Sequence, residues 1–274
     1  MFNKEPPGCV QGHHNPDDKW ETLDQTKVRY SLASDAILAQ SPDAVLLQEL
    51  SVDFFNPAVN PRAEALLARF EIAQQTNSAG PGTAVLLRWG GPLKSTGVVF
   101  SAGASEELTG GTSKSASAVL VQVGGTRLWI VSVHLTPHKY NPEAVRRHLE
   151  ILGVALRAGT DTTLSSSSPP RVILGGDLNA EPHEVVMLQR ELATLGGALS
   201  RVVAPGDTGL SANFSTPESI DHIFISPGLR LLDVQMERQP PSGPYAAQAS
   251  AAAGATPVAF ASDHVWQAVR LVVD

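Results

Sequence analysis

The stretch RVILGGDLN, residues 171–179, runs from a buried strand into a polar turn. Its first half is rich in β-branched residues and carries no charge after the opening arginine, as is typical of a strand inside a sheet. Gly175 and Gly176 let the backbone turn sharply, because they have no side chain to clash. Asp177 and Asn179 follow, and residues two apart on an extended segment point the same way. We therefore expect a carboxylate and an amide to be presented together at the edge of a sheet.

Three other motifs lie next to apolar runs in the same manner: LLQEL at 46–50, SVHL at 132–135 and ASDH at 261–264. They contribute the four polar residues Glu49, His134, Asp263 and His264, while SIDHIFIS at 219–226 adds Asp221. Acidic and amide oxygens suit a hard divalent cation, and histidines beside them suit a phosphate ester. Each motif alone is weak, but their order along the chain predicts a metal-dependent phosphoesterase.

Composition excludes several other classes of protein. The chain has 274 residues, 42% of them hydrophobic and 17% charged, with one cysteine and a formal net charge of −7. A single cysteine cannot form an intrachain disulfide, so we expect an intracellular, soluble protein. No apolar run approaches the roughly 20 residues that span a bilayer, and MFNKEPPG does not have the pattern of a signal peptide. The acidic charge disfavours a protein that coats polynucleotides more than it disfavours an enzyme.

The pattern of apolar residues predicts an α/β fold. Helical spacing is seen over 28–40, near 61–70, from Asn141 to a stop at Gly159, and over 182–195. Besides the motif strands, we expect strands near 71–75, 83–88, 96–101, 117–123 and 127–134, and a final strand over 264–273. Hairpins mixed with helical crossovers predict two mixed, mostly antiparallel sheets packed face to face with helices outside, a four-layer α/β sandwich. We expect one catalytic domain over 1–274, with flexible loops at about 159–170 and 239–259.

These motifs resemble those of the endonuclease/exonuclease/phosphatase superfamily, which has the deoxyribonuclease I-like fold. PDAVLLQEL is similar to the family's glutamate motif, VSVHL to its histidine motif and VILGGDLNAEP to its GDxN motif. SIDHIFIS and FASDHVWQAV look like its aspartate and terminal SDH motifs. The resemblance covers nearly the whole chain, and it is strongest to the deadenylase/nuclease and tyrosyl-DNA phosphodiesterase branches.

The resemblance implies a role for each motif residue. Glu49, Asn3 and Asp263 would hold Mg²⁺, with Mn²⁺ as an alternative. Asp177 would orient and deprotonate the attacking water, and Asn179 would hold water or phosphate. His134 and His264 would donate hydrogen bonds to phosphoryl oxygens, and Asp221 would pair with His264. Only Met1 and Phe2 precede Asn3, so the family's first core strand is expected to be truncated.

The substrate is less well defined by the sequence, because a superfamily shares its chemistry and not its substrates. We expect a phosphodiester substrate, in particular a nucleic-acid end or a small nucleotide-like diester, with Asn213 and His138 as substrate contacts. No protein partner is predicted. A phosphomonoesterase or a lipid phosphodiesterase of the same fold is the alternative, and a catalytically inactive binding module is the alternative of a different class.

Overall fold

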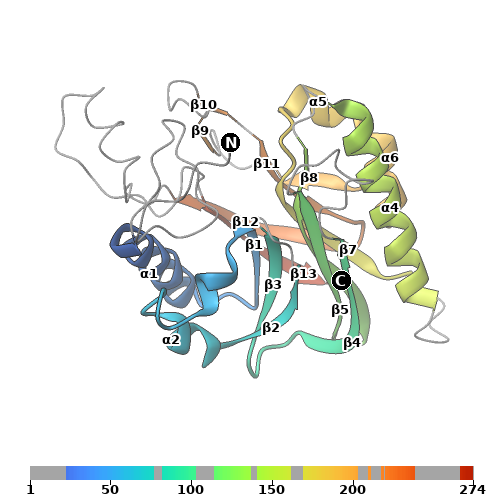
Figure 1. Ribbon diagram of the computed structural model, residues 1–274. Coiled ribbons are helices and arrows are strands. Elements are labelled where there is room, and N and C mark those ends of the chain that lie inside the picture. Colours follow the sequence, from blue (N-terminus) through green and yellow to red (C-terminus); the bar gives the residue numbers. More distant parts are fainter. Residues whose placement is uncertain are drawn as a thin grey trace.

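A computed structural model describes residues 23–76, 82–102, 114–136, 141–161, 169–202, 209–210, 217–218, 220–237 and 266–273. Within these ranges the chain has a mixed α/β fold with antiparallel and mixed sheets, as predicted. Two sheets lie between helices that cover their outer faces (Figure 1). The predicted strands within these ranges are all present, and their ends differ from the prediction by a few residues.

The smaller of these two sheets is antiparallel and has three strands. Its order is β1 (Ala44–Leu50), β3 (Gly82–Arg88) and β2 (Phe70–Gln75). On one side of it lie helix α1 (Leu23–Gln40), a 3₁₀ turn over Val52–Phe55 and helix α2 (Ala63–Leu67). Central strand β3 is buried on both faces, which explains its nearly continuous apolar sequence.

The larger sheet has six strands and is mixed. Its order is β4 (Lys94–Ala102), β5 (Ser115–Val123), β6 (Thr126–His134), β7 (Arg171–Asp177), β11 (Asp221–Ile225) and β8 (Ser200–Val202). Only the β6–β7 pair is parallel. Parallel neighbours need a long crossover, and helix α4 (Pro142–Asp161) supplies it. The polar C-terminal ends of β6 and β7 therefore meet at one edge.

Successive side chains of β6 point to opposite faces of the large sheet and belong to two different hydrophobic clusters. Trp129 and Val131 pack against the apolar side of α4, together with α5 (Pro182–Met187) and α6 (Gln189–Gly196). Leu128 and Ile130 point the other way and pack against β3 of the small sheet. Two two-stranded ladders complete the described structure: β12 (Leu229–Glu237) with β13 (Trp266–Val273), and β9 (Gly209–Leu210) with β10 (Pro217–Glu218).

The predicted helix stop at Gly159 is wrong, because α4 continues to Asp161. A Cβ added at Gly159 would lie 3.0 Å from Cζ2 of Trp129, so the missing side chain lets the helix pass close to the indole ring. The Trp129 ring N–H donates to Oγ1 of Thr160 at 3.1 Å and holds the last turn. Here glycine permits close packing and does not cap the helix. Residues 162–168 of the predicted loop, and all of 239–259, lie outside the described residues.

The helix predicted over 182–195 is interrupted. It begins at Pro182 as expected, and the carboxylate of Glu184 accepts a hydrogen bond from the backbone N–H of Glu181 at 2.7 Å. Leu188 then separates α5 from α6 and is fully buried. The backbone at Leu188 leaves the helical region, with φ −95° and ψ 4°, a break that apolar periodicity does not reveal.

Candidate active site

Three predicted site residues lie in one row across the large sheet. His134, the last residue of β6, pairs with Asp177, the last residue of β7. Asp177 also pairs with Asp221, the first residue of β11. Neighbouring strands are about 4.8 Å apart, so the three side chains start from adjacent positions on the same sheet edge. The predicted convergence of these strand ends is therefore observed.

Gly176 allows this row to form. Its φ is +139°, and a Cβ added there would lie 2.1 Å from the carbonyl oxygen of Val133. The same Cβ would lie 3.0 Å from Nε2 of Gln48, which comes from the small sheet. Any side chain at this position would push β7 away from both neighbours. The glycine is thus needed for close packing as well as for its backbone angle.

The carboxylate of Asp177 is held on both of its oxygens. The backbone N–H of Asn179 donates to Oδ1 at 2.7 Å, and the side-chain amide of Asn179 donates to Oδ2 at 3.0 Å. The same amide nitrogen donates to the carbonyl oxygen of Leu135 at 2.8 Å. Asn179 has a φ of +50°, a conformation that asparagine adopts more readily than most residues. Asn179 therefore fixes the direction of a carboxylate that is only 4% exposed.

Glu49 reaches the same edge from the small sheet by way of a β-bulge. Leu47 pairs with Ala84 and Leu50 with Gly82, so β1 has one extra residue in this interval. Glu49 occupies the bulge with a φ of +52°. A bulge re-aims a side chain, and an unfavourable backbone angle persists only where the surroundings require it. The local distortion directs the Glu49 carboxylate toward the end of β6.

Hydrogen bonds between the two sheets hold this bulge in place. Nε2 of Gln48 donates to Oγ of Ser132 at 2.8 Å, and that hydroxyl donates to the carbonyl oxygen of Leu47 at 2.8 Å. These two hydrogen bonds connect β1 with β6 at Ser132, two residues before His134. It fixes the position of Glu49 relative to His134.

His134 lies between the two carboxylates. Its Nε2 is 3.3 Å from Oδ2 of Asp177 and 3.8 Å from Oε1 of Glu49. The imidazole is almost completely buried, whereas the Glu49 side chain is 55% exposed. Among the described residues, Nδ1 of His134 has no hydrogen-bond partner. The nitrogen that faces the candidate site is therefore Nε2.

Lys114 is a residue of this site that the sequence did not reveal. It precedes β5, and its Nζ lies within hydrogen-bonding distance of Nε2 of His134. Burial lowers the pKa of the Lys114 ammonium, whereas the negative charges of Asp177 and Glu49 raise it. The signal that the sequence offers is indirect: Lys114 lies just before the strand expected over 117–123, which is next along the chain to the strand that ends at His134.

Five predicted site residues, Asn3, His138, Asn213, Asp263 and His264, lie outside the described residues. Of the predicted metal ligands, only Glu49 is described. Within the described ranges, no three His, Cys, Asp or Glu side chains form a metal site. The donor chemistry nevertheless fits a divalent cation, because a carboxylate oxygen of Glu49 and one of Asp177 both lie within 4 Å of Nε2 of His134.

Two buried histidines near the site are neutral at physiological pH. Burial, and secondarily the nearby His134, lowers the pKa of His148 to about 4. Burial also lowers the pKa of His222 to about 4, although its Nε2 lies 2.7 Å from the carbonyl oxygen of Ala180. His222 points away from Asp221 into the interior, as the alternation along the strand predicts.

These two histidines predict acid sensitivity of the fold. Histidine titrates near 6.5 in the unfolded chain, so between pH 6.5 and 4 the unfolded state binds more protons than the folded state. The free energy of unfolding should therefore decrease as the pH falls through this window, by up to roughly 3 kcal/mol per histidine. Urea unfolding at several pH values measures the slope. His148→Gln should reduce it, and the same change at exposed His183 is the control. An unchanged slope in His148→Gln contradicts the assignment.

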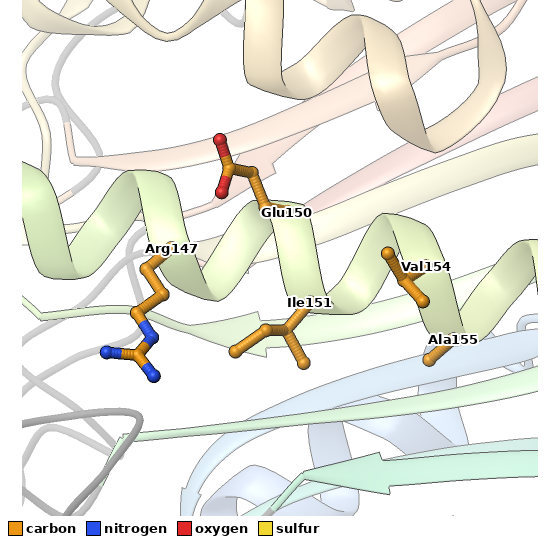
Figure 2. A pocket seen from close by; sticks show the side chains of 5 residues that line it. All are labelled: Arg147, Glu150, Ile151, Val154 and Ala155. Atoms are coloured by element: carbon orange, nitrogen blue, oxygen red, sulfur yellow. The ribbon is translucent and has the colours of Figure 1, made fainter.

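A surface hollow elsewhere on the molecule is unrelated to this chemistry. Figure 2 shows that it lies along one helix, α4, and its lining residues are Arg147, Glu150, Ile151, Val154 and Ala155. It contains one carboxylate and none of the predicted site residues.

Among the helices of the described ranges, none has the length and hydropathy to cross a membrane.

The sequence matches a known family over most of its length. The model of the endonuclease/exonuclease/phosphatase family matches residues 21–264, which includes the quoted motifs from Glu49 to His264 but not the N-terminal asparagine. No curated protein matches the chain significantly in sequence.

Solved structures show the same fold at low sequence identity. An endonuclease/exonuclease/phosphatase from Bacteroides vulgatus aligns with a TM-score of 0.64 and 14% identity, over 96% of this chain and 96% of that chain. TDP2 from D. rerio, complexed with single-strand DNA product, aligns with a TM-score of 0.61 and 16% identity, over 91% and 92% of the two chains. ANGEL2, a 2′,3′-cyclic phosphatase in complex with adenosine-2′,3′-vanadate, aligns with a TM-score of 0.60 and 14% identity, over 74% and 76%.

The family match and the shared fold agree with the order of the motifs along the chain and with the row of polar strand ends in the structure. The resemblance inferred from the sequence is confirmed. This chain belongs to the endonuclease/exonuclease/phosphatase family and is a hydrolase of phosphate ester bonds.

Proposed function

We propose that the protein is a divalent-metal-dependent phosphodiesterase that acts on nucleic-acid ends or on small nucleotide-like diesters. One observation carries the proposal: Glu49, His134 and Asp177 converge at a single sheet edge, with Nε2 of His134 within 4 Å of both carboxylates. Two carboxylates so close together repel each other and would repel a phosphate anion. A bound cation would offset the repulsion between the carboxylates and their repulsion of the phosphate.

Glu49 is the described residue best placed to hold the metal, and Asn3 and Asp263 would complete the ligand set. Glu49 is half exposed, which leaves room for the water molecules that Mg²⁺ retains. When bound, the metal supplies polarisation of a phosphate oxygen and neutralises charge on the departing oxygen. Mg²⁺ is the proposed ion, and Mn²⁺ is the alternative.

Asp177 would hold the attacking water and take its proton. Its carboxylate is buried and accepts two hydrogen bonds from Asn179, so its direction is set before a substrate binds. His134 would donate from Nε2 to a phosphoryl oxygen, because that nitrogen faces the two carboxylates. Asp177 and His134 are the last residues of their strands, so the pairing of β6 with β7 sets where both side chains begin.

His264 and Asp221 would form the second hydrogen-bonding pair to the phosphate, with Asp221 fixing the imidazole ring. One contact supports this assignment. The side chain of Gln267, three residues after His264, donates to the backbone oxygen of Asp221 at 3.2 Å. The chain near the terminal motif therefore returns to the start of β11.

The proposed substrate class is supported by the chemistry of the site and by the ligands of two proteins of similar fold. TDP2 from D. rerio is complexed with single-strand DNA product, and ANGEL2 with adenosine-2′,3′-vanadate. The net charge of −7 disfavours a broad polyanion-binding face, so a strand end or short diester is favoured over a long duplex. Asn213 and His138 are proposed as substrate contacts. We further propose that residues 1–274 form one domain, a four-layer α/β sandwich.

Hydrolysis of bis-p-nitrophenyl phosphate tests the proposal. Nitrophenol release should require added Mg²⁺ or Mn²⁺, stop after exhaustive chelation and return when the metal is restored. A silent parent protein refutes the enzymatic assignment, and activity that survives chelation refutes the metal dependence. A panel of single- and double-stranded DNA, RNA, 5′-tyrosyl DNA, sphingomyelin and phosphomonoesters then selects the substrate. Faster hydrolysis of the monoesters would favour a phosphomonoesterase.

A further inference from the structure

The ammonium group of Lys114 lies among the polar residues of the candidate site. Its Nζ contacts Nε2 of His134, and the charges of Asp177 and Glu49 both act on it. None of the motifs that predict the site contains this lysine. Its position depends on the start of β5, where Ser115 pairs with His134.

The backbone at Lys114 is held in place by hydrogen bonds between the sheets. The hydroxyl of Ser115 donates to Oγ1 of Thr83 at 3.3 Å, and the hydroxyl of Ser117 donates to the carbonyl oxygen of Thr83 at 2.9 Å. These three residues are fully buried. Lys114 therefore directly precedes a strand that hydrogen bonds connect to the other sheet.

Neutralising the two acids does not account for this lysine. Both oxygens of Asp177 already accept hydrogen bonds from Asn179, and the Glu49 side chain is 55% exposed to water. Burial opposes the charge of Lys114 more strongly than the two acids favour it. The two acids therefore offset the cost of burying the ammonium charge only in part. The negative charge of a bound substrate phosphate would stabilise the ammonium further.

We propose that Lys114 is a further catalytic residue, whose ammonium donates to a non-bridging oxygen of the substrate phosphate. An ammonium has three N–H donors, so when a phosphate binds, Lys114 can donate to it in place of Nε2 of His134, which is then left to donate to the phosphate as well. The negative charge on the non-bridging oxygens must be stabilised as water attacks, and a fixed cation in a partly dry site is effective there. Lys114 keeps its proton throughout, so no bond to it is made or broken. This inference rests on the proposed phosphodiesterase function.

Substitution of Lys114 separates catalysis from structural support. With saturating Mg²⁺ and bis-p-nitrophenyl phosphate, Lys114→Met should lower kcat by about 100-fold with a much smaller change in KM. Lys114→Arg should retain more activity than Lys114→Met, because it keeps the charge. Ethylammonium should partly restore Lys114→Ala, whereas tetramethylammonium, which has no N–H donor, should not. Lys94→Met, at an exposed position of β4, is the matched control and should behave as the parent.

The outcomes distinguish this inference from the proposed function. If the parent is inactive, the proposed function itself fails. If the parent is active and Asp177→Asn is not, but Lys114→Met keeps the parental kcat, only the role of Lys114 is overturned, whatever happens to its melting temperature. If Lys114→Ala loses activity and neither amine restores it, while Lys114→Arg is equally inactive, the lysine is structural and the inference is wrong. Selective rescue by ethylammonium supports it.

Discussion

Asp177→Asn lowers kcat for a phosphodiester by about 1,000-fold or more, because it removes the group that takes the proton from the attacking water. The change keeps the size of the side chain and removes one negative charge. The new amide can still accept the hydrogen bond from the backbone of Asn179 through its oxygen. Its nitrogen faces the amide donor of Asn179, so one hydrogen bond is lost. The expected cost in stability is therefore about 1 kcal/mol.

Steady-state kinetics with Mg²⁺ and bis-p-nitrophenyl phosphate, together with urea unfolding, measure both effects. Asp24→Asn, at an exposed position in the first turn of α1, is the control and should leave kcat unchanged. An Asp177→Asn variant that keeps more than a tenth of the parental kcat would rule out this residue as the general base. A variant that is inactive because it is unfolded is recognised by its circular dichroism.

Gly176→Ala has the largest expected effect on stability. The new Cβ would lie 2.1 Å from the carbonyl oxygen of Val133, and φ at this position is +139°. Backbone strain and overpacking each contribute about 1–3 kcal/mol. The free energy of unfolding should therefore fall by about 4 kcal/mol, an effect large enough to unfold many domains.

The control for this glycine is Gly97→Ala in β4. Gly97 also has a positive φ, +78°, but nothing lies within 4 Å of an added Cβ. Its replacement should cost only about 1 kcal/mol, from the backbone angle alone. Urea unfolding compares the two variants directly. Equal losses would show that the close approach of β7 to β6 is unimportant.

Residues at the ends of regular strands could be predicted from the sequence. His134 and Asp177 follow apolar runs, and the long helical segment between these runs predicts a crossover that places their strands side by side. Asp221 opens a strand of the same sheet. Local patterns were sufficient here because each residue occupies the regular end of a regular element.

The remaining parts of the site depend on contacts between strands that are far apart in the sequence, and a local sequence pattern does not predict such contacts. Glu49 was predicted as a strand-end acid, but its direction comes from a bulge held by the hydrogen bond from Gln48 to Ser132. Lys114 reaches the site only because β5 lies beside β6. Strand β12 was missed as well. Its one described strand neighbour is the distant β13, and a bulge between Leu231 and Asp233 breaks its apolar alternation into two short pieces.

The central claim is that side chains from separate strand ends share one divalent cation. A crystal structure with Mn²⁺, measured at a wavelength where manganese scatters anomalously, tests it most directly. We predict an anomalous peak about 2 Å from the Glu49 carboxylate, at the edge where Asp177 and His134 meet. A well-ordered Glu49 with no peak beside it, in crystals of protein that is active with Mn²⁺, would contradict the account.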